Sequence, residues 1–167
     1  IRKNYIPKVF YSTTIAQNGF LDALIVLSAC INLVKEIFIL YNGRVSIRDL
    51  ASLSTKIYTA VAVGGSETVE YATEEVISKL TSDGLQSIPF ANVVAKSITD
   101  GYVNAMLVTR ISLIAENYCS LVYIDNDKEL YPDSNFVIDT TKVITKDIMD
   151  VIWGKLKEAP MDKLESA

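Results

Sequence analysis

The sequence predicts an all-α protein that folds as a single helical bundle of about five to six helices. Apolar residues recur at helical spacing along most of the chain, and capping residues or glycines delimit the periodic segments. Half of the 167 residues are hydrophobic and 22% are charged, so the apolar side chains suffice for one buried core. We expect an N-terminal arm over residues 1–17, a bundle domain over 18–158 and a tail over 159–167.

The most apolar helix is expected from about Asn18 to Tyr41. It is apolar on nearly every side, which is typical of a central core helix or of a membrane-spanning segment. The charge-free run between Asp22 and Lys35 is shorter than the ~18 residues that a bilayer crossing requires. We therefore interpret this helix as the centre of the bundle, with Asn42-Gly43 as its C-terminal stop.

The next helices are delimited by caps and glycines. Ser46-Ile-Arg-Asp49 is a capping box, and it starts a helix that is expected to end at Gly64-Gly65. Ser66 caps a third helix, which is expected to stop at Asp83-Gly84. Pro89 fits the first turn of a fourth helix, because the first amides of a helix have no intrahelical partner.

Two further features complete the bundle. The fourth helix is expected to reach about Val122, with Gly101 as the point at which it would bend or split. Turn-forming residues then predict an irregular loop near 123–138. Apolar residues return at helical spacing from about Asp139 to Glu158, which predicts the last helix.

The composition argues against nucleic-acid binding and against most enzymes. The net charge is −4 and the pI is near 4.9, without the cluster of Lys and Arg that a nucleic-acid-binding surface needs. Histidine, the commonest general base and nitrogen ligand for metals, is absent. Cys30 and Cys119 lie in apolar runs and are interpreted as reduced, structural thiols. We expect no cofactor, no metal and no catalytic residue.

Arg110 stands in an apolar stretch without an acidic residue one helical turn away. A guanidinium in such a place needs a carboxylate to offset its loss of hydration. We hypothesise an ion pair with Asp22, or with Glu67 or Glu70. The alternative is that Arg110 extends along its aliphatic stem to the surface.

Four small residues of the same helix lie four positions apart: Ser97, Gly101, Ala105 and Thr109. They form a groove over which another helix can approach closely. The groove fits an internal helix crossing or a seam between two copies of the chain. The internal crossing is the favoured interpretation, because helical bundles commonly need such contacts.

Glu67, Glu70 and Glu74 share one helical face. Together with Asp22 they could form a carboxylate metal site, but the Glu-x-x-His pairs of such bundles require histidine. A solvated acidic face is therefore the favoured interpretation.

Two blocks of the sequence resemble the YcjF-like bacterial proteins, a family of unknown function. The first block contains Leu21-Asp22, Leu33-Val34-Lys35-Glu36-Ile37 and Leu40-Tyr41-Asn42-Gly43-Arg44, and the second contains Gly101, Val108-Thr109-Arg110-Ile111-Ser112-Leu113, Glu116 and Cys119. The resemblance spans about Gly19 to Cys119. It implies a domain that in relatives follows membrane-spanning helices or is fused beside a small GTPase. It also implies a location at the cytoplasmic face of the bacterial inner membrane, or in the cytoplasm.

Together these observations predict a non-enzymatic helical domain of a membrane-associated bacterial protein. The mean hydropathy of +0.26 is high for a free monomer, so we expect a partner or lipid to cover part of the surface. The expected role is self-association, or binding to a membrane surface or a GTPase-type protein. The alternatives are a bilayer-inserting hairpin, formed by residues 20–41 and the run after Tyr102, and the metal protein described above.

Overall fold

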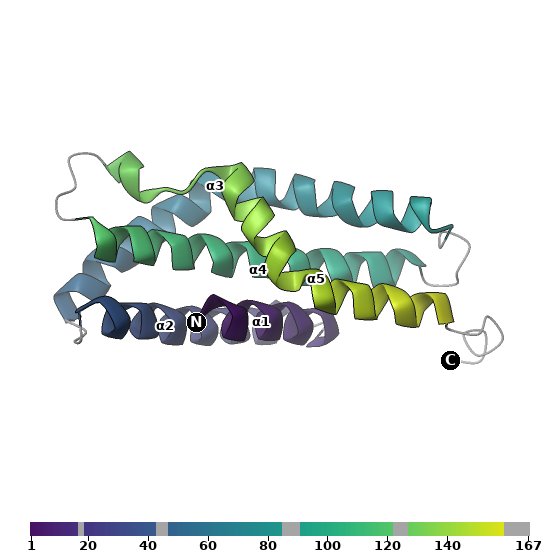
Figure 1. The fold of residues 1–167 in the computed structure, drawn as a ribbon, viewed down its shortest axis with the longest axis horizontal. Coiled ribbons are helices and arrows are strands. Elements are labelled where there is room, and N and C mark those ends of the chain that lie inside the picture. The colour runs from purple at the N-terminus through teal and green to yellow at the C-terminus, as the bar shows by residue number, and fades with distance from the viewer. Residues whose placement is uncertain (17–18, 43–46, 85–90, 122–126, 159–167) are drawn as a thin grey trace.

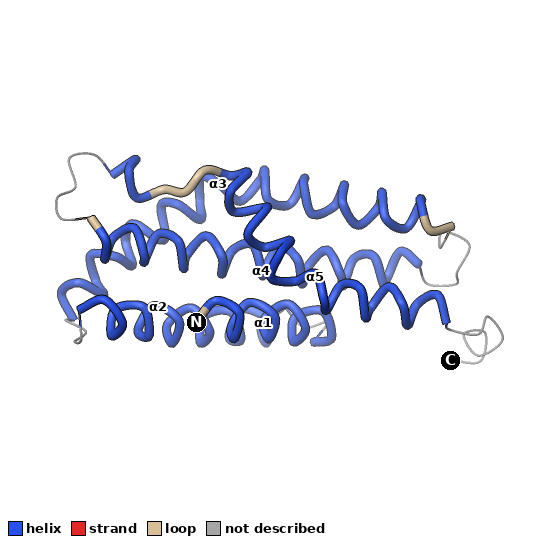
Figure 2. Tube along the Cα trace, in the orientation of Figure 1, coloured by secondary structure: helices blue, strands red, loops and turns tan. Residues whose placement is uncertain are grey.

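Helices make up nearly all of the part of the chain that the structure describes. The computed structural model describes residues 1–16, 19–42, 47–84, 91–121 and 127–158, and for 56–68 it describes the backbone alone. These ranges contain no strand, and the prediction of an all-α bundle is confirmed (Figure 2). The elements in chain order are α1 (Arg2–Ala16), α2 (Gly19–Asn42), α3 (Ile47–Ser82), α4 (Ala91–Ser120), the 3-10 helix η2 (Asp127–Leu130) and α5 (Ser134–Glu158).

Helix α4 runs through the middle of the bundle (Figure 1). Helices α1 and α2 lie side by side along one side of it, and α5 crosses it in front. Helix α3 starts near the end of α2, passes behind α4 and continues along the opposite side. Helix α4 packs against all four of these helices and against η2. Twelve of its residues are buried: Ile98, Gly101, Tyr102, Ala105, Met106, Val108, Thr109, Ile111, Ser112, Leu113, Ile114 and Ala115.

The prediction that the helix beginning near residue 18 is the centre of the bundle is therefore wrong. Only 33% of Leu21–Tyr41 in α2 is buried. The physical reason is that a central helix needs small residues where its neighbours cross it closely, and α4 has these residues at Gly101, Ala105 and Ala115. The hydropathy of α2 is high on all sides, so it does not distinguish the side that faces the core from the side that faces outward.

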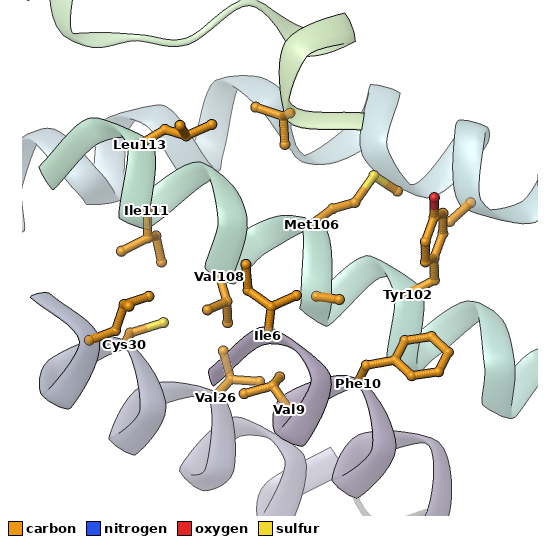
Figure 3. Packing of buried hydrophobic residues seen from close by; sticks show 14 of the residues in the cluster. Ile6, Val9, Phe10, Val26, Cys30, Tyr102, Met106, Val108, Ile111 and Leu113 are labelled. Carbon is orange, nitrogen blue, oxygen red and sulfur yellow. The ribbon is translucent and has the colours of Figure 1, made fainter. Parts of the chain in front are cut away.

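The predicted N-terminal arm is a core helix. In α1 the side chains of Ile6, Val9 and Phe10 are at most 2% exposed. Figure 3 shows Ile6 and Val9 pointing into the space between α1, α2 and α4. It shows Phe10 between α1 and α4, where its ring meets that of Tyr102 edge to face with the centroids 6.3 Å apart. Residues 2–16 are therefore part of the helical bundle, although the sequence predicts that the bundle begins at residue 18.

Helix α3 is longer than predicted. Its backbone continues through Gly64-Gly65, where the sequence predicted a break, so one helix replaces the second and third predicted ones. A glycine inside a helix costs about 1 kcal/mol relative to alanine, but it does not forbid helical dihedrals. The predicted stop at Asp83-Gly84 is confirmed, since α3 ends at Ser82 and Gly84 has a φ of 67°. Helix α4 likewise passes through Gly101 without a split.

Helix α5 begins at Ser134, five residues before the predicted Asp139. Asp133 caps it, because one carboxylate oxygen accepts hydrogen bonds from the backbone amides of Asn135 (2.9 Å) and Phe136 (3.3 Å). Asp133 lies within a run of turn-forming residues, which is why the sequence predicts a loop as far as residue 138 rather than a helix from residue 134. The capping box at 46–49, the cap at Ser66, Pro89, residues 122–126 and the tail after 158 lie outside the described residues or side chains.

Candidate interaction surface

Helix α2 has an inner face and an outer face. Its inner face packs on α1 and α4 through Val26, Cys30, Leu33, Ile37 and Phe38. Burial raises the pKa of the Cys30 thiol to about 12, so this cysteine stays protonated at neutral pH. The outer face consists of the exposed residues Leu21, Leu24, Leu27, Ser28, Ile31, Asn32, Lys35 and Ile39.

The outer face of α2 is mostly apolar, and none of the described residues covers it. Leu24, Leu27 and Ile31 are 47%, 57% and 58% exposed. Soluble monomers rarely expose contiguous apolar patches larger than a few hundred Å², and larger ones mark contacts with proteins or membranes. Leu21–Tyr41 is also long and apolar enough to cross a membrane, with a mean hydropathy of 2.2. The core helices of soluble proteins and signal sequences have the same length and composition.

Helix α1 carries a positive charge. It carries Arg2, Lys3 and Lys8 and no acidic residue, although the whole chain has a net charge of −4. Lys3 and Lys8 are exposed, as are the apolar side chains of Tyr11 and Ile15 further along α1.

The structure does not bring the predicted ion-pair residues together. Arg110 is half-buried, its Nη2 donates a hydrogen bond to Ser134 Oγ at 3.3 Å, and it forms no ion pair within the described residues. Glu70 is exposed, and the side chain of Glu67 lies outside the described part. In Asp22 one carboxylate oxygen is shielded from solvent without a hydrogen-bond partner among the described residues. Loss of hydration raises the pKa of Asp22, and the carboxylate of Asp100 raises it further.

An ion pair between helices does exist, but it involves Arg2. The guanidinium of Arg2 pairs with Glu116 of α4, and its Nε donates to Ser112 Oγ at 2.8 Å. The hydroxyl of Tyr41 at the end of α2 donates to Glu116 at 3.0 Å. This cluster joins α1, α2 and α4. Sequence reasoning missed it because the partners lie in segments far apart in the chain.

The groove of small residues on α4 receives α1 and α5. A Cβ atom added to Gly101 would lie 2.1 Å from Thr14 Oγ1 and 2.8 Å from the Phe10 carbonyl oxygen, so α1 crosses α4 at this glycine. The side chain of Ala105 is fully buried, and Ser97 lies beside α1 in a shallow groove. The hydroxyl of Thr141 in α5 donates to that of Thr109 at 2.9 Å. This arrangement supports the internal crossing.

The acidic residues of α3 do not converge. Glu70 and Glu74 are exposed, while Glu75 accepts a hydrogen bond from Tyr71 at 2.9 Å and pairs with Lys142 at 3.4 Å. Across the described ranges, no group of three or more acids or cysteines could hold a metal ion. A groove of about 530 Å³ between α3 and α4 is open and has mostly apolar walls.

Comparisons with known proteins provide no assignment for this surface. No family model matches the chain, and neither a curated protein nor a solved structure shows significant similarity to it. The functional argument therefore rests on the residues of the chain itself, and the resemblance to the YcjF-like family stays a prediction.

Proposed function

We propose that this chain is a non-enzymatic helical docking domain of a membrane-associated bacterial protein in the YcjF-like family, and that the outer face of α2 binds its partner. The observation that carries the proposal is the exposure of Leu24, Leu27 and Ile31 on one side of an otherwise packed helix. Full burial of such a side chain contributes about 1.5–3 kcal/mol. Covering several half-exposed ones would therefore yield several kcal/mol for binding.

Two observations support a role without catalysis. Histidine is missing from the sequence, and of the acidic residues predicted to share one face of α3, Glu70 and Glu74 are exposed to solvent. The polar groups buried between helices, such as Thr109 and Thr141, bond to each other and to the backbone, which is what a structural role requires. The sequence resemblance supports the cytoplasmic face of the inner membrane as the location.

The experiment compares the wild-type chain with two double variants. Leu24→Gln with Leu27→Gln alters the outer face, whereas Val143→Gln with Val151→Gln alters two exposed valines of α5 and serves as the control. Each protein is analysed by sedimentation velocity and by flotation with vesicles of neutral or anionic lipid, at low and high salt. We expect the wild type and the control to associate with themselves or with vesicles, and the outer-face variant to lose this association. A wild-type chain that stays monomeric and does not float in any condition would contradict the proposal.

A second candidate function is insertion of α2 into a bilayer. The length and hydropathy of Leu21–Tyr41 favour it. Lys35 and Glu36 oppose it, because both are exposed charged residues inside this segment and each costs ~2.5–3.5 kcal/mol at the bilayer centre. Hydrogen exchange of the α2 amides, measured with and without the same vesicles, tests this candidate. Unchanged exchange rates on addition of vesicles would exclude insertion.

A further inference from the structure

A groove of about 300 Å³ is lined by residues of α3, α4 and α5 and by none of α2. Its lining combines three lysines with two buried aromatic side chains. The lysines are Lys79 of α3 and Lys142 and Lys146 of α5, and the aromatic residues are Tyr102 of α4 and Trp153 of α5. A concave surface on which a few polar groups converge beside aromatic walls is typical of sites that bind small ligands.

The hydroxyl of Tyr102 is an unpartnered hydrogen-bond donor in this groove. The residue is 2% exposed, and its hydroxyl, which points away from Phe10 in Figure 3, makes no hydrogen bond within the described residues. Burial raises the pKa of this hydroxyl far above its usual range, and Tyr71, Glu75 and Asp139 raise it further, so the hydroxyl keeps its proton. Because buried polar groups nearly always have a partner, this donor calls for one from outside the chain.

Lys146 supplies a positive charge that the chain does not offset. It is exposed where it lines the groove, and it forms no ion pair within the described residues. The other two lysines do have acidic neighbours: Lys142 Nζ lies 3.4 Å from Glu75 Oε2, and Lys79 Nζ lies 3.9 Å from Asp83 Oδ2. Lys142 and Lys146 are four positions apart and therefore share one face of α5.

The two acidic residues of the groove, Glu75 and Asp150, do not cancel its positive charge. Glu75 is bound by Lys142 and accepts a hydrogen bond from the Tyr71 hydroxyl at 2.9 Å, and Asp150 is exposed to water. Three lysines and two acids leave the lining with one net positive charge, in a chain whose net charge is −4. A free ammonium group near a protonated hydroxyl favours a negatively charged oxygen as their common acceptor.

We propose that this groove binds a small organic oxyanion, that is, a phosphate or carboxylate carried on an aromatic or apolar group. The Tyr102 hydroxyl donates to the oxyanion, and the ammonium group of Lys146 attracts it. Trp153, which is 4% exposed, and Met149 line the groove with apolar surface for the rest of the ligand. This site does not depend on the docking role proposed for α2.

The test uses the fluorescence of Trp153, which is the only tryptophan of the chain and lines the groove. Phenyl phosphate and benzoate are titrated into the full chain at low salt, and benzyl alcohol serves as the uncharged probe. We expect at least one of the two anions to change the emission at a lower concentration than benzyl alcohol does, and high salt to weaken this binding. The anion that binds more tightly identifies the oxyanion. Amide chemical shifts of α3 and α5 are measured in the same titrations, and the absence of any change in both emission and shifts would overturn the proposal.

Three single variants locate the binding. Tyr102→Phe removes the hydroxyl and keeps the ring, and it should weaken anion binding by about tenfold, as expected for one hydrogen bond to a charged group. Lys146→Gln should weaken it roughly two- to fivefold, the range for an exposed ion pair. Lys155→Gln makes the same change of charge at an exposed lysine of α5 outside the groove, so it should leave binding unchanged.

Two results of these variants would overturn the site. Equal weakening by Lys146→Gln and Lys155→Gln would mean that the anion responds only to the overall charge. Unchanged anion binding in Tyr102→Phe would mean that the hydroxyl bonds only to water. If circular dichroism shows that Tyr102→Phe does not fold, the comparison of the two lysine variants decides, because both positions are exposed. None of these variants alters α2, so the results are independent of the flotation and sedimentation experiments.

Discussion

Replacing Gly101 with alanine should lower the free energy of unfolding by about 1–3 kcal/mol, and replacing it with valine should lower it further. The added Cβ would lie 2.1 Å from Thr14 Oγ1 and 2.8 Å from the carbonyl oxygen of Phe10. The Thr14 hydroxyl can turn away, but the carbonyl oxygen moves only with the whole of α1. This steric cost exceeds the gain of about 1 kcal/mol that alanine has over glycine inside a helix. Urea unfolding followed by circular dichroism measures the change.

Gly154→Ala is the matched control for this prediction. Gly154 also lies inside a helix, but no atom stands within 4 Å of the position of its added Cβ. We therefore expect it to gain about 0.5–1 kcal/mol from the restricted unfolded chain and the better helix propensity. If Gly101→Ala stabilised the protein as much as Gly154→Ala, α1 would not cross α4 at this glycine.

Replacing Phe10 with alanine should cost about 3–5 kcal/mol, which is a large part of the stability of a domain of this size. The ring of Phe10 is fully buried between α1 and α4 and meets Tyr102 edge to face. Its removal loses both the transfer free energy of the ring and the aromatic contact, and it leaves a cavity. Thermal unfolding by calorimetry measures the loss.

The neighbouring residue provides the control for Phe10. Tyr11 is 55% exposed, so Tyr11→Ala should change the free energy of unfolding by no more than about 0.5 kcal/mol. Equal effects of the two substitutions would mean that residues 2–16 are the loosely attached arm that the sequence suggested, rather than a core helix.

The fold class could be predicted because helical periodicity and stop signals are local properties. The stop of α3 before Gly84 follows from a glycine whose effect needs no tertiary information. The position of α2 could not be predicted, because Leu27 and Leu33 are equally apolar in the sequence and only the packing makes one exposed and the other buried. The same holds for α1, whose core role depends on the close approach at Gly101.

The candidate surface was only partly predictable. The high mean hydropathy predicts that a partner or lipid covers part of the surface, but it does not assign the exposed apolar side chains to the outer face of α2. The proposed pair of Arg110 and Asp22 was not formed, since Arg110 donates to Ser134 at the start of α5 and Asp22 lies near Asp100. The guanidinium of Arg2 forms an ion pair between helices, and its partner Glu116 is 114 positions away along the printed sequence.

The orientation of α2 decides whether the bundle exposes an apolar docking face, and one pair of identical substitutions tests it most directly. Leu27 is 57% exposed on the outer face, whereas Leu33 is fully buried on the inner face. Urea unfolding of Leu27→Ala and Leu33→Ala, at a protein concentration low enough to keep the chain monomeric, compares the two faces. We predict a loss of about 2–5 kcal/mol for Leu33→Ala and of less than about 1 kcal/mol for Leu27→Ala. Equal losses at the two positions, or a larger loss at Leu27, would contradict the account.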